Sequence, residues 1–279
     1  MPARYLLCLL LGLAAGARAE PTAMPRPAAL EPAVRFWSRV FSEVDTRSGF
    51  LHDDRRLDVV YGTLRWSGDL ERGARQALVE PQRLAIQNIL LRLADGNADT
   101  SDPQVRRVRA LWQGASPTQL REAAGRVRFQ LGQADRFAAA LRRSGTWEDH
   151  IRRTLGQYGV PQEIGALPYV ESGFDPMAGS HVGAAGLWQF MASTGRLFLR
   201  IDNYVDERYD PHAATVAAAK LLRGNYDALG TWPLALTAYN HGRAGMRRAV
   251  DSMGTGDIAT LIERYDGPAF GFASRNFYP

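Results

Sequence analysis

The sequence of 279 residues predicts a mainly helical protein. Apolar side chains recur at three- and four-residue spacing through most of the chain, which is typical of amphipathic helices. Prolines follow residues that commonly cap helix starts, at Asp102-Pro103, Ser116-Pro117 and Asp210-Pro211. Alternation of apolar and polar residues, which marks a strand, is weak where it occurs, at Leu57 to Tyr61. These three observations favour helices packed on helices.

Residues 1–19 have the pattern of an export signal. Arg4 precedes the apolar run Tyr5 to Leu13, and small residues end the segment at Ala17-Arg18-Ala19. The single cysteine, Cys8, lies in that run, so we expect no disulfide in the exported protein. No later run approaches the roughly 20 apolar residues that a membrane span needs, and we expect none in the mature chain.

The charge of the chain is mildly basic. The formal net charge is +5, and loss of Arg4 and Arg18 with the signal leaves +3. Arginines alternate with acids throughout, as on solvated helix faces. An exported chain with so small an excess charge is not typical of nucleic-acid-binding proteins, and we expect no nucleic-acid partner.

A proline-rich leader, residues 20–32, precedes the N-terminal helical region, residues 33–144. We expect a helix with inward aromatic residues over 33–44 and a helix over 72–95 that is broken at Pro81. Further helices start at Asp102 and Ser116, and the second of these continues to Leu141 with a joint at Gly132. None of these segments carries evident chemistry.

Composition changes near residue 145, where arginine-rich helices give way to a segment dense in glycine, proline and aromatic residues. We therefore expect a separate domain over residues 145–279. Helices are predicted in it over 146–158, 161–171, 211–226, 234–240, 244–250 and 258–265.

Glu171 is the candidate catalytic residue, because it stands where an apolar helix stops. Pro161 opens that helix and Ser172-Gly173 breaks it. The unpaired carbonyls of the helix end and the apolar bodies of Tyr169 and Trp188 both favour the protonated acid, which can donate a proton. A glutamate at a helix end is nevertheless most often a solvated surface residue.

The segment after Glu171 favours the functional interpretation. It contains no Asp or Glu between Met177 and Ile201, although 23% of the chain is charged. Glycines interleave there with Ser180 and Gln189, so backbone and polar groups can approach a ligand closely. We interpret this segment as the wall of a site that has one acid.

Several kinds of chemistry lack support in the sequence. The histidines are scattered and have no cysteine partner, so we predict no metal site; they are His52, His150, His181, His212 and His241. No nucleophile elbow or phosphate-binding loop occurs, and we predict no cofactor. Acid catalysis remains, in a groove lined by Tyr169, Trp188 and Tyr239, a lining that suits sugars.

Three motifs resemble the goose-lysozyme-like (family 1) lytic murein transglycosylases, of the membrane-bound D type. They are ESGFDP from Glu171, GAAGLWQ from Gly183 and AYN from Ala238, in the family's order. The resemblance implies a lysozyme-like domain that acts on peptidoglycan glycan strands. It also implies an exported protein in the periplasm of a Gram-negative-type bacterium, at the wall or the outer membrane.

The resemblance further implies cleavage of the bond between N-acetylmuramic acid and N-acetylglucosamine without water, which leaves a 1,6-anhydromuramyl end. Glu171 would act first as acid and then as base. Ser180 matches the family serine that holds the substrate's acetamido group, and Gln189 matches the cleft glutamine. Tyr239 and Asn240 match the pair beside the cleaved bond.

The sequence departs from the family pattern near residue 277. A tyrosine is usual in the final motif, where this chain has Phe277, with Tyr278 beside it. His241 follows the AYN motif where alanine is common, and it could reach the cleft or cap the helix.

Two alternative functions stay open at this point. A hydrolytic muramidase would need a second group to hold water, for which Asp175 is the nearest candidate in the sequence. A non-catalytic protein that binds wall glycan would keep the groove without turnover.

Overall fold

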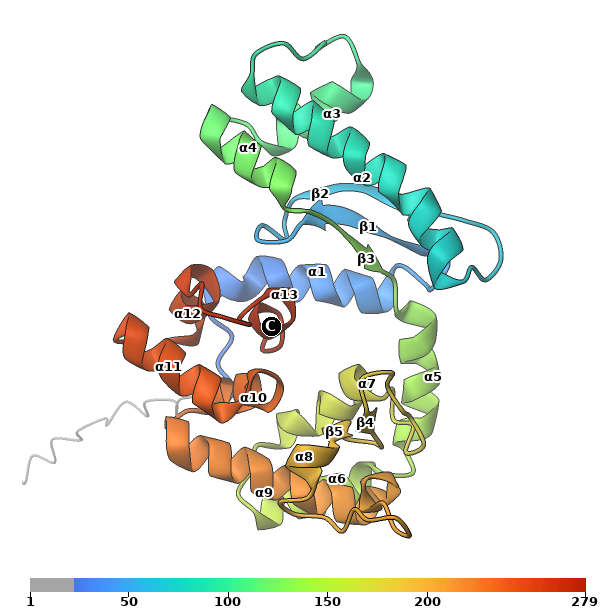
Figure 1. The fold of residues 1–279 in the computed structure, drawn as a ribbon, viewed down its shortest axis with the longest axis vertical. Coiled ribbons are helices and arrows are strands. Elements are labelled where there is room, and N and C mark those ends of the chain that lie inside the picture. Colours follow the sequence, from blue (N-terminus) through green and yellow to red (C-terminus); the bar gives the residue numbers. More distant parts are fainter. Residues whose placement is uncertain (1–22) are drawn as a thin grey trace, which may run out of the picture.

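The computed structural model describes residues 23–279 (Figure 1). The predicted signal at residues 1–19 lies outside this range. The N-terminal region contains five α-helices among its described residues: α1 (Glu31–Ser42), α2 (Arg72–Ala94), α3 (Pro103–Leu111), α4 (Pro117–Gly125) and α5 (Ala134–Ser144). A short turn of 3-10 helix, η1 (Ala28–Leu30), precedes α1.

A three-stranded antiparallel sheet stands within this largely helical region. Its strands are β1 (Ser48–Asp53), β2 (Val60–Arg65) and β3 (Val127–Leu131), in the order β2-β1-β3. The predicted extended segment around Val60 is thus a strand. The helix expected across residues 127–131 was wrong, because that segment pairs with β1 from Gly49 opposite Leu131 to Asp53 opposite Val127.

Helix starts followed the capping signals. Asp102 accepts a hydrogen bond from the Gln104 backbone, and Ser116 forms a capping box with Gln119. The break predicted at Pro81 was wrong, since α2 continues through that proline to Ala94. Pro81 is exposed, as is usual for a proline on the outer face of a packed helix.

The C-terminal region is built from short helices around a small hairpin. Its elements are α6 (Glu148–Gln157), η2 (Gln162–Ala166), α7 (Leu167–Glu171), β4 (Ala184–Ala185), β5 (Phe190–Met191), α8 (Ala192–Gly195), η3 (Glu207–Tyr209), α9 (Pro211–Leu229), α10 (Trp232–His241), α11 (Arg243–Met253), α12 (Ile258–Arg264) and α13 (Phe272–Arg275). Among the described residues, no helix is both long and apolar enough to cross a membrane.

The N-terminal and C-terminal regions have separate buried apolar clusters. One cluster joins the sheet to α2, α3 and α4 through Val59, Leu90 and Val108. Another surrounds α9 and includes Leu187 and Leu222. A small cluster on α1 and β1 is covered by Phe272 of α13, so the last helix packs against the first helix of the other region (Figure 1).

Candidate functional site

Glu171 is the last residue of α7, as the sequence predicted. The backbone N–H of the next residue, Ser172, donates to Pro168 O at 3.1 Å, and its hydroxyl donates to Leu187 O at 2.8 Å. Gly173 and Phe174 then take positive φ values of 61° and 57°, which turns the chain sharply away from the helix axis. The end of α7 is therefore fixed on both sides of the acid.

The environment of Glu171 favours its neutral form. Burial raises the pKa of this carboxyl from 4.5 to about 7. Within residues 23–279, no ion pair or hydrogen bond joins the Glu171 side chain to another residue, so nothing opposes the cost of desolvation. Close to neutral pH such a group exists in both forms and can both give and take a proton.

Glu171 opens into a cleft of about 640 Å³, a size in the range usual for ligand sites. Tyr169 and Gln189, both expected at the site, line the same cleft. The Tyr169 hydroxyl donates to Glu148 Oε1 at 3.0 Å, and its ring packs edge-on against the buried Phe174 at 4.4 Å. Tyr169 is thus held as a fixed wall beside the acid.

A tight hairpin presents Gln189 to the cleft. The side-chain N–H of Gln189 donates to Gly186 O at 2.9 Å and to Ala178 O at 3.2 Å, which locks the amide. Gly186 has a φ of 78°, and a Cβ at this position would lie 1.7 Å from Arg208 O. Only glycine allows this close approach, and the approach sets the path of the chain into Gln189.

Trp188 does not line the cleft, and the expectation that its ring faces the ligand was wrong. Its side chain is fully buried, and its indole N–H donates to Thr215 Oγ1 at 2.9 Å. Its backbone carbonyl accepts a hydrogen bond from the Tyr239 hydroxyl at 2.8 Å. Trp188 therefore supports the site from behind.

Tyr239 lies near Glu171 but lines an adjacent hollow between α8 and α11. Burial, and then the negative charge of Glu171, raise the pKa of Tyr239 well above its usual value. Asn240, the next residue, is exposed, and its side-chain oxygen accepts a bond from the Ser274 hydroxyl at 3.2 Å.

Ser180 sits in the turn beside the cleft, next to its lining residues Ala178 and Gly179. Its backbone N–H donates to Ala184 O at 2.8 Å, and its hydroxyl oxygen accepts from the Ala184 N–H at 2.9 Å. The hydroxyl proton is not used in these bonds and can still be donated.

The residues that depart from the family pattern are not among those that line the cleft. The Phe277 ring stacks on Tyr239 at 6.5 Å, and the Tyr278 hydroxyl donates to Pro25 O. His241 packs edge-on against Phe270 at 5.0 Å, where burial lowers its pKa. Asp175 accepts the Met177 N–H at 2.9 Å, which is the bond of a turn residue.

The opposite wall of the cleft comes from the N-terminal region, and sequence reasoning missed it. The residues of this wall lie on α1, β3 and α5 and in the link before α5; they are Trp37, Phe41, Gln130, Gln133, Arg136, Phe137, Ala139 and Arg143. Aromatic residues at helical spacing look alike in a core and in a groove. The one signal available in the sequence was the number of polar residues that stand before and after Phe137 along the chain, which is unusual for a core segment.

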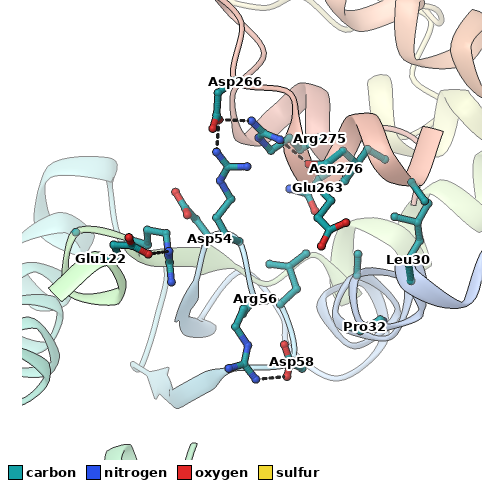
Figure 2. A pocket seen from close by; sticks show the side chains of 18 residues that line it. Leu30, Pro32, Asp54, Arg56, Asp58, Glu122, Glu263, Asp266, Arg275 and Asn276 are labelled. Carbon is teal, nitrogen blue, oxygen red and sulfur yellow. Dashed lines mark hydrogen bonds and ion pairs between the residues drawn. The ribbon is translucent and has the colours of Figure 1, made fainter. Parts of the chain in front are cut away.

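A larger cavity of about 790 Å³ lies between η1, the turn after β1, α4 and α12 (Figure 2). Apart from Asp54, charged side chains in it are paired: Asp266 joins Arg55 and Arg275, and Arg56 lies 2.9 Å from Asp58. We therefore place the candidate active site at Glu171 and not in this cavity.

No group of three or more metal-binding side chains occurs in the described part of the chain. His150 and His212 do stack edge-on at 4.3 Å, where burial lowers the pKa of His150. The packing of Trp147 against His212 at 5.7 Å makes these rings part of the junction between α6 and α9.

Comparison with known proteins gives this geometry a family context. Residues 150–262 match the family model described as "Transglycosylase SLT domain". Over 93 residues, 33% of this chain, the sequence is 42% identical to the membrane-bound lytic murein transglycosylase D of Escherichia coli (strain K12). Over 97 residues, 34% of this chain, it is 34% identical to a transglycosylase of Enterobacteria phage PRD1.

These matches span 21% and 35% of the two relatives' own lengths, so the chain covers only part of each. The family-model match, residues 150–262, contains all three sequence motifs. The predicted fold class is confirmed: a mainly α protein, with a lysozyme-like domain that follows a largely helical region. Residues 150–262 of the chain are thus similar to transglycosylase SLT domains.

Proposed function

We propose that the protein is a peptidoglycan lytic transglycosylase. It cleaves the bond between N-acetylmuramic acid and N-acetylglucosamine and leaves a 1,6-anhydromuramyl end. The observation that carries the proposal is the lone Glu171 carboxyl, whose pKa burial raises to about 7, within a matched transglycosylase domain. The substrate is the murein that the E. coli relative's name specifies.

In the first step, protonated Glu171 gives its proton to the glycosidic oxygen as the bond from muramyl C1 to that oxygen breaks. The departing N-acetylglucosamine keeps the proton as a hydroxyl. The acetamido oxygen of the muramyl residue stabilises C1, and Ser180 at the edge of the cleft holds that acetamido group through its free hydroxyl proton.

In the second step, the Glu171 carboxylate takes the proton of the muramyl C6 hydroxyl while that oxygen bonds to C1. The acid is then restored, and no water is consumed. Gln189 and Tyr169 border the reacting sugar in the cleft. Tyr239, from the adjacent hollow, and the exposed Asn240 bind the strand beyond it. A carboxyl with a pKa near 7 serves both steps, because neither form is strongly disfavoured.

The proposed location follows from the same assignment. A murein-degrading enzyme with the predicted export signal acts in the periplasm, at the wall or the outer membrane. We further propose the domain limits given above, with the lysozyme-like domain over residues 145–279 and the N-terminal region over residues 33–144.

The test is to incubate the protein with peptidoglycan and to identify the released ends by mass spectrometry. We expect anhydromuramyl ends, which are one water lighter than reducing ends, and a loss of at least about a hundredfold in kcat for Glu171→Gln. Above a pH of about 7, kcat/KM should fall close to tenfold per pH unit, because the ionised acid cannot donate.

Two outcomes contradict the proposal. Reducing ends alone would identify a hydrolytic muramidase. Binding of glycan strands by the parent protein and by Glu171→Gln, with no turnover in either, would identify a glycan-binding wall protein.

A further inference from the structure

The N-terminal region lies outside the family match, which begins at residue 150. It nevertheless lines the cleft. We propose that it is the second wall of the glycan site. In this assignment its aromatic rings stack on sugar rings, and its amides and arginines bind the acetamido and carboxylate groups of an acidic N-acetylated strand. The inference rests on the proposed function and extends it to residues outside the family domain.

A continuous row of aromatic rings carries the first part of the argument. Ring centroids lie 6.2 Å apart for Trp37 and Phe41, 5.7 Å for Phe41 and Phe137, and 5.2 Å for Phe137 and Tyr169. All four rings line the cleft and are only half-buried. Flat apolar surface kept open to solvent beside an acid suits the C–H faces of sugar rings.

Hydrogen bonds hold this row in place. The Trp37 indole N–H donates to Asn276 Oδ1 at 3.0 Å. At the other end, the Arg143 guanidinium on α5 donates to Gly173 O at 2.6 and 2.9 Å, two residues beyond Glu171. The second wall is thus tied directly to the turn that carries the acid, and the two walls keep a fixed spacing.

Polar groups on the wall face the same space. Gln130 and Gln133 line the cleft, and the Gln130 amide N–H donates to Leu131 O at 2.9 Å. Within residues 23–279 the Gln133 side chain makes no hydrogen bond, so both its donor and its acceptor are available. An acetamido group offers the matching acceptor and donor.

The charge of the cleft indicates which glycan it fits. Its charged lining residues are Arg136, Arg143 and Glu171, so the cleft is cationic when Glu171 is protonated. Arg136 is exposed and forms no ion pair with any described residue. Where a stem peptide is attached, the lactyl carboxyl of muramic acid is taken up in the amide bond and the carboxylates lie on the peptide. A strand without peptide carries the lactyl carboxylate instead.

The experiment compares cleft variants with matched controls in the full chain. Gln133→Ala and Arg136→Gln should each raise KM for peptidoglycan strands about three- to tenfold with kcat unchanged. Gln82→Ala on α2 and Arg107→Gln on α3 are exposed substitutions of the same types outside the cleft, and they should leave KM unchanged. Phe41→Leu, which keeps most of the volume, should also raise KM.

Binding to strands is measured in the Glu171→Gln background, so that the strand stays intact. A loss of binding with Arg136→Gln that is confined to strands stripped of peptide assigns the lactyl carboxylate, and a loss that needs the peptide assigns the stem. An equal loss on uncharged chitin oligosaccharides would overturn the charge assignment.

Unchanged KM and binding in Gln133→Ala, Arg136→Gln and Phe41→Leu would overturn the inference while leaving the proposed function intact. Absence of anhydromuramyl products from the parent protein would refute the proposed function instead. The binding comparison would then still test the second wall.

Discussion

Acidic side chains are held differently in the cleft around Glu171 and in the cavity of Figure 2. In the cavity, a hydrogen bond from Arg55 lowers the pKa of Asp266, and Arg275 lies 2.6 Å from the same carboxyl oxygen. In the cleft, Glu171 forms no ion pair with any described residue, and burial raises its pKa to about 7. Pairing keeps an acid ionised, whereas desolvation without a partner prepares it to donate a proton.

Asp54, an acid of the larger cavity, is partly desolvated as Glu171 is, but arginines lie near it. Burial and the neighbouring Asp53 raise the pKa of Asp54, and one Asp54 oxygen is buried without a partner. Nearby arginines, Arg55 first among them, act against that rise. For Glu171, burial is the cause of the raised pKa and no arginine acts against it, which favours the cleft over the larger cavity as the place of a proton that can be donated.

The largest effect is expected from breaking the pairing in the cavity. Arg275→Met removes a buried guanidinium that donates to Ile262 O, Tyr265 O and Asp266. Two carbonyls lose their partners, so the free energy of unfolding should fall by roughly 2 to 4 kcal/mol. Urea denaturation measures this loss, and the pH profile of the remaining activity should keep its midpoint near 7. A shift in the midpoint of the pH profile would link the cavity to catalysis and contradict the difference drawn between the cavity and the cleft.

The next effect is expected from removing the lone acid. The folded pKa of Glu171 lies above its unfolded value of 4.5, so the folded state binds more protons between 4.5 and about 7. Stability of the parent therefore falls as pH rises through that window. Glu171→Gln should be more stable than the parent by up to roughly 3 kcal/mol at a pH of about 8, and equally stable at about pH 4.

Unfolding curves at both pH values check this second prediction. A stability difference that is the same at both would mean that Glu171 is not desolvated. The contrast between the cleft and the cavity would then be wrong for Glu171.

The smallest effect is expected from removing the second acid in this part of the chain, Asp175. Asp175 lies near the cleft, but its carboxyl accepts the Met177 N–H, as a turn residue does. Asp175→Asn keeps an oxygen for that bond, so kcat should change by less than about twofold. A loss of tenfold or more in a peptidoglycan assay would make Asp175 a second catalytic acid and revive the muramidase mechanism.

Local signals made part of this site predictable. The breakers after Glu171 act within one turn, so the place of the acid at the end of α7 followed from sequence. The buried position of Trp188 could not be predicted, because the sequence does not distinguish a motif residue that contacts a ligand from one that packs behind the site.

Pairing between distant segments could not be read from sequence. Strand β3 joins β1 across a separation of some 80 residues, and its apolar residues at positions 127, 129 and 131 also fit a helix continued from α4. The second wall of the cleft depends on the same kind of contact, because Trp37 and Phe137 meet Tyr169 only once both regions have folded.

The bond between Trp37 and Asn276 joins residues 239 positions apart, near the two limits of the described chain. Contacts of such long range form late, because so large a loop must first close. Trp37 is therefore fixed only when α13 packs against α1. The proposed second wall is therefore complete only after the N-terminal and C-terminal regions have both folded and docked.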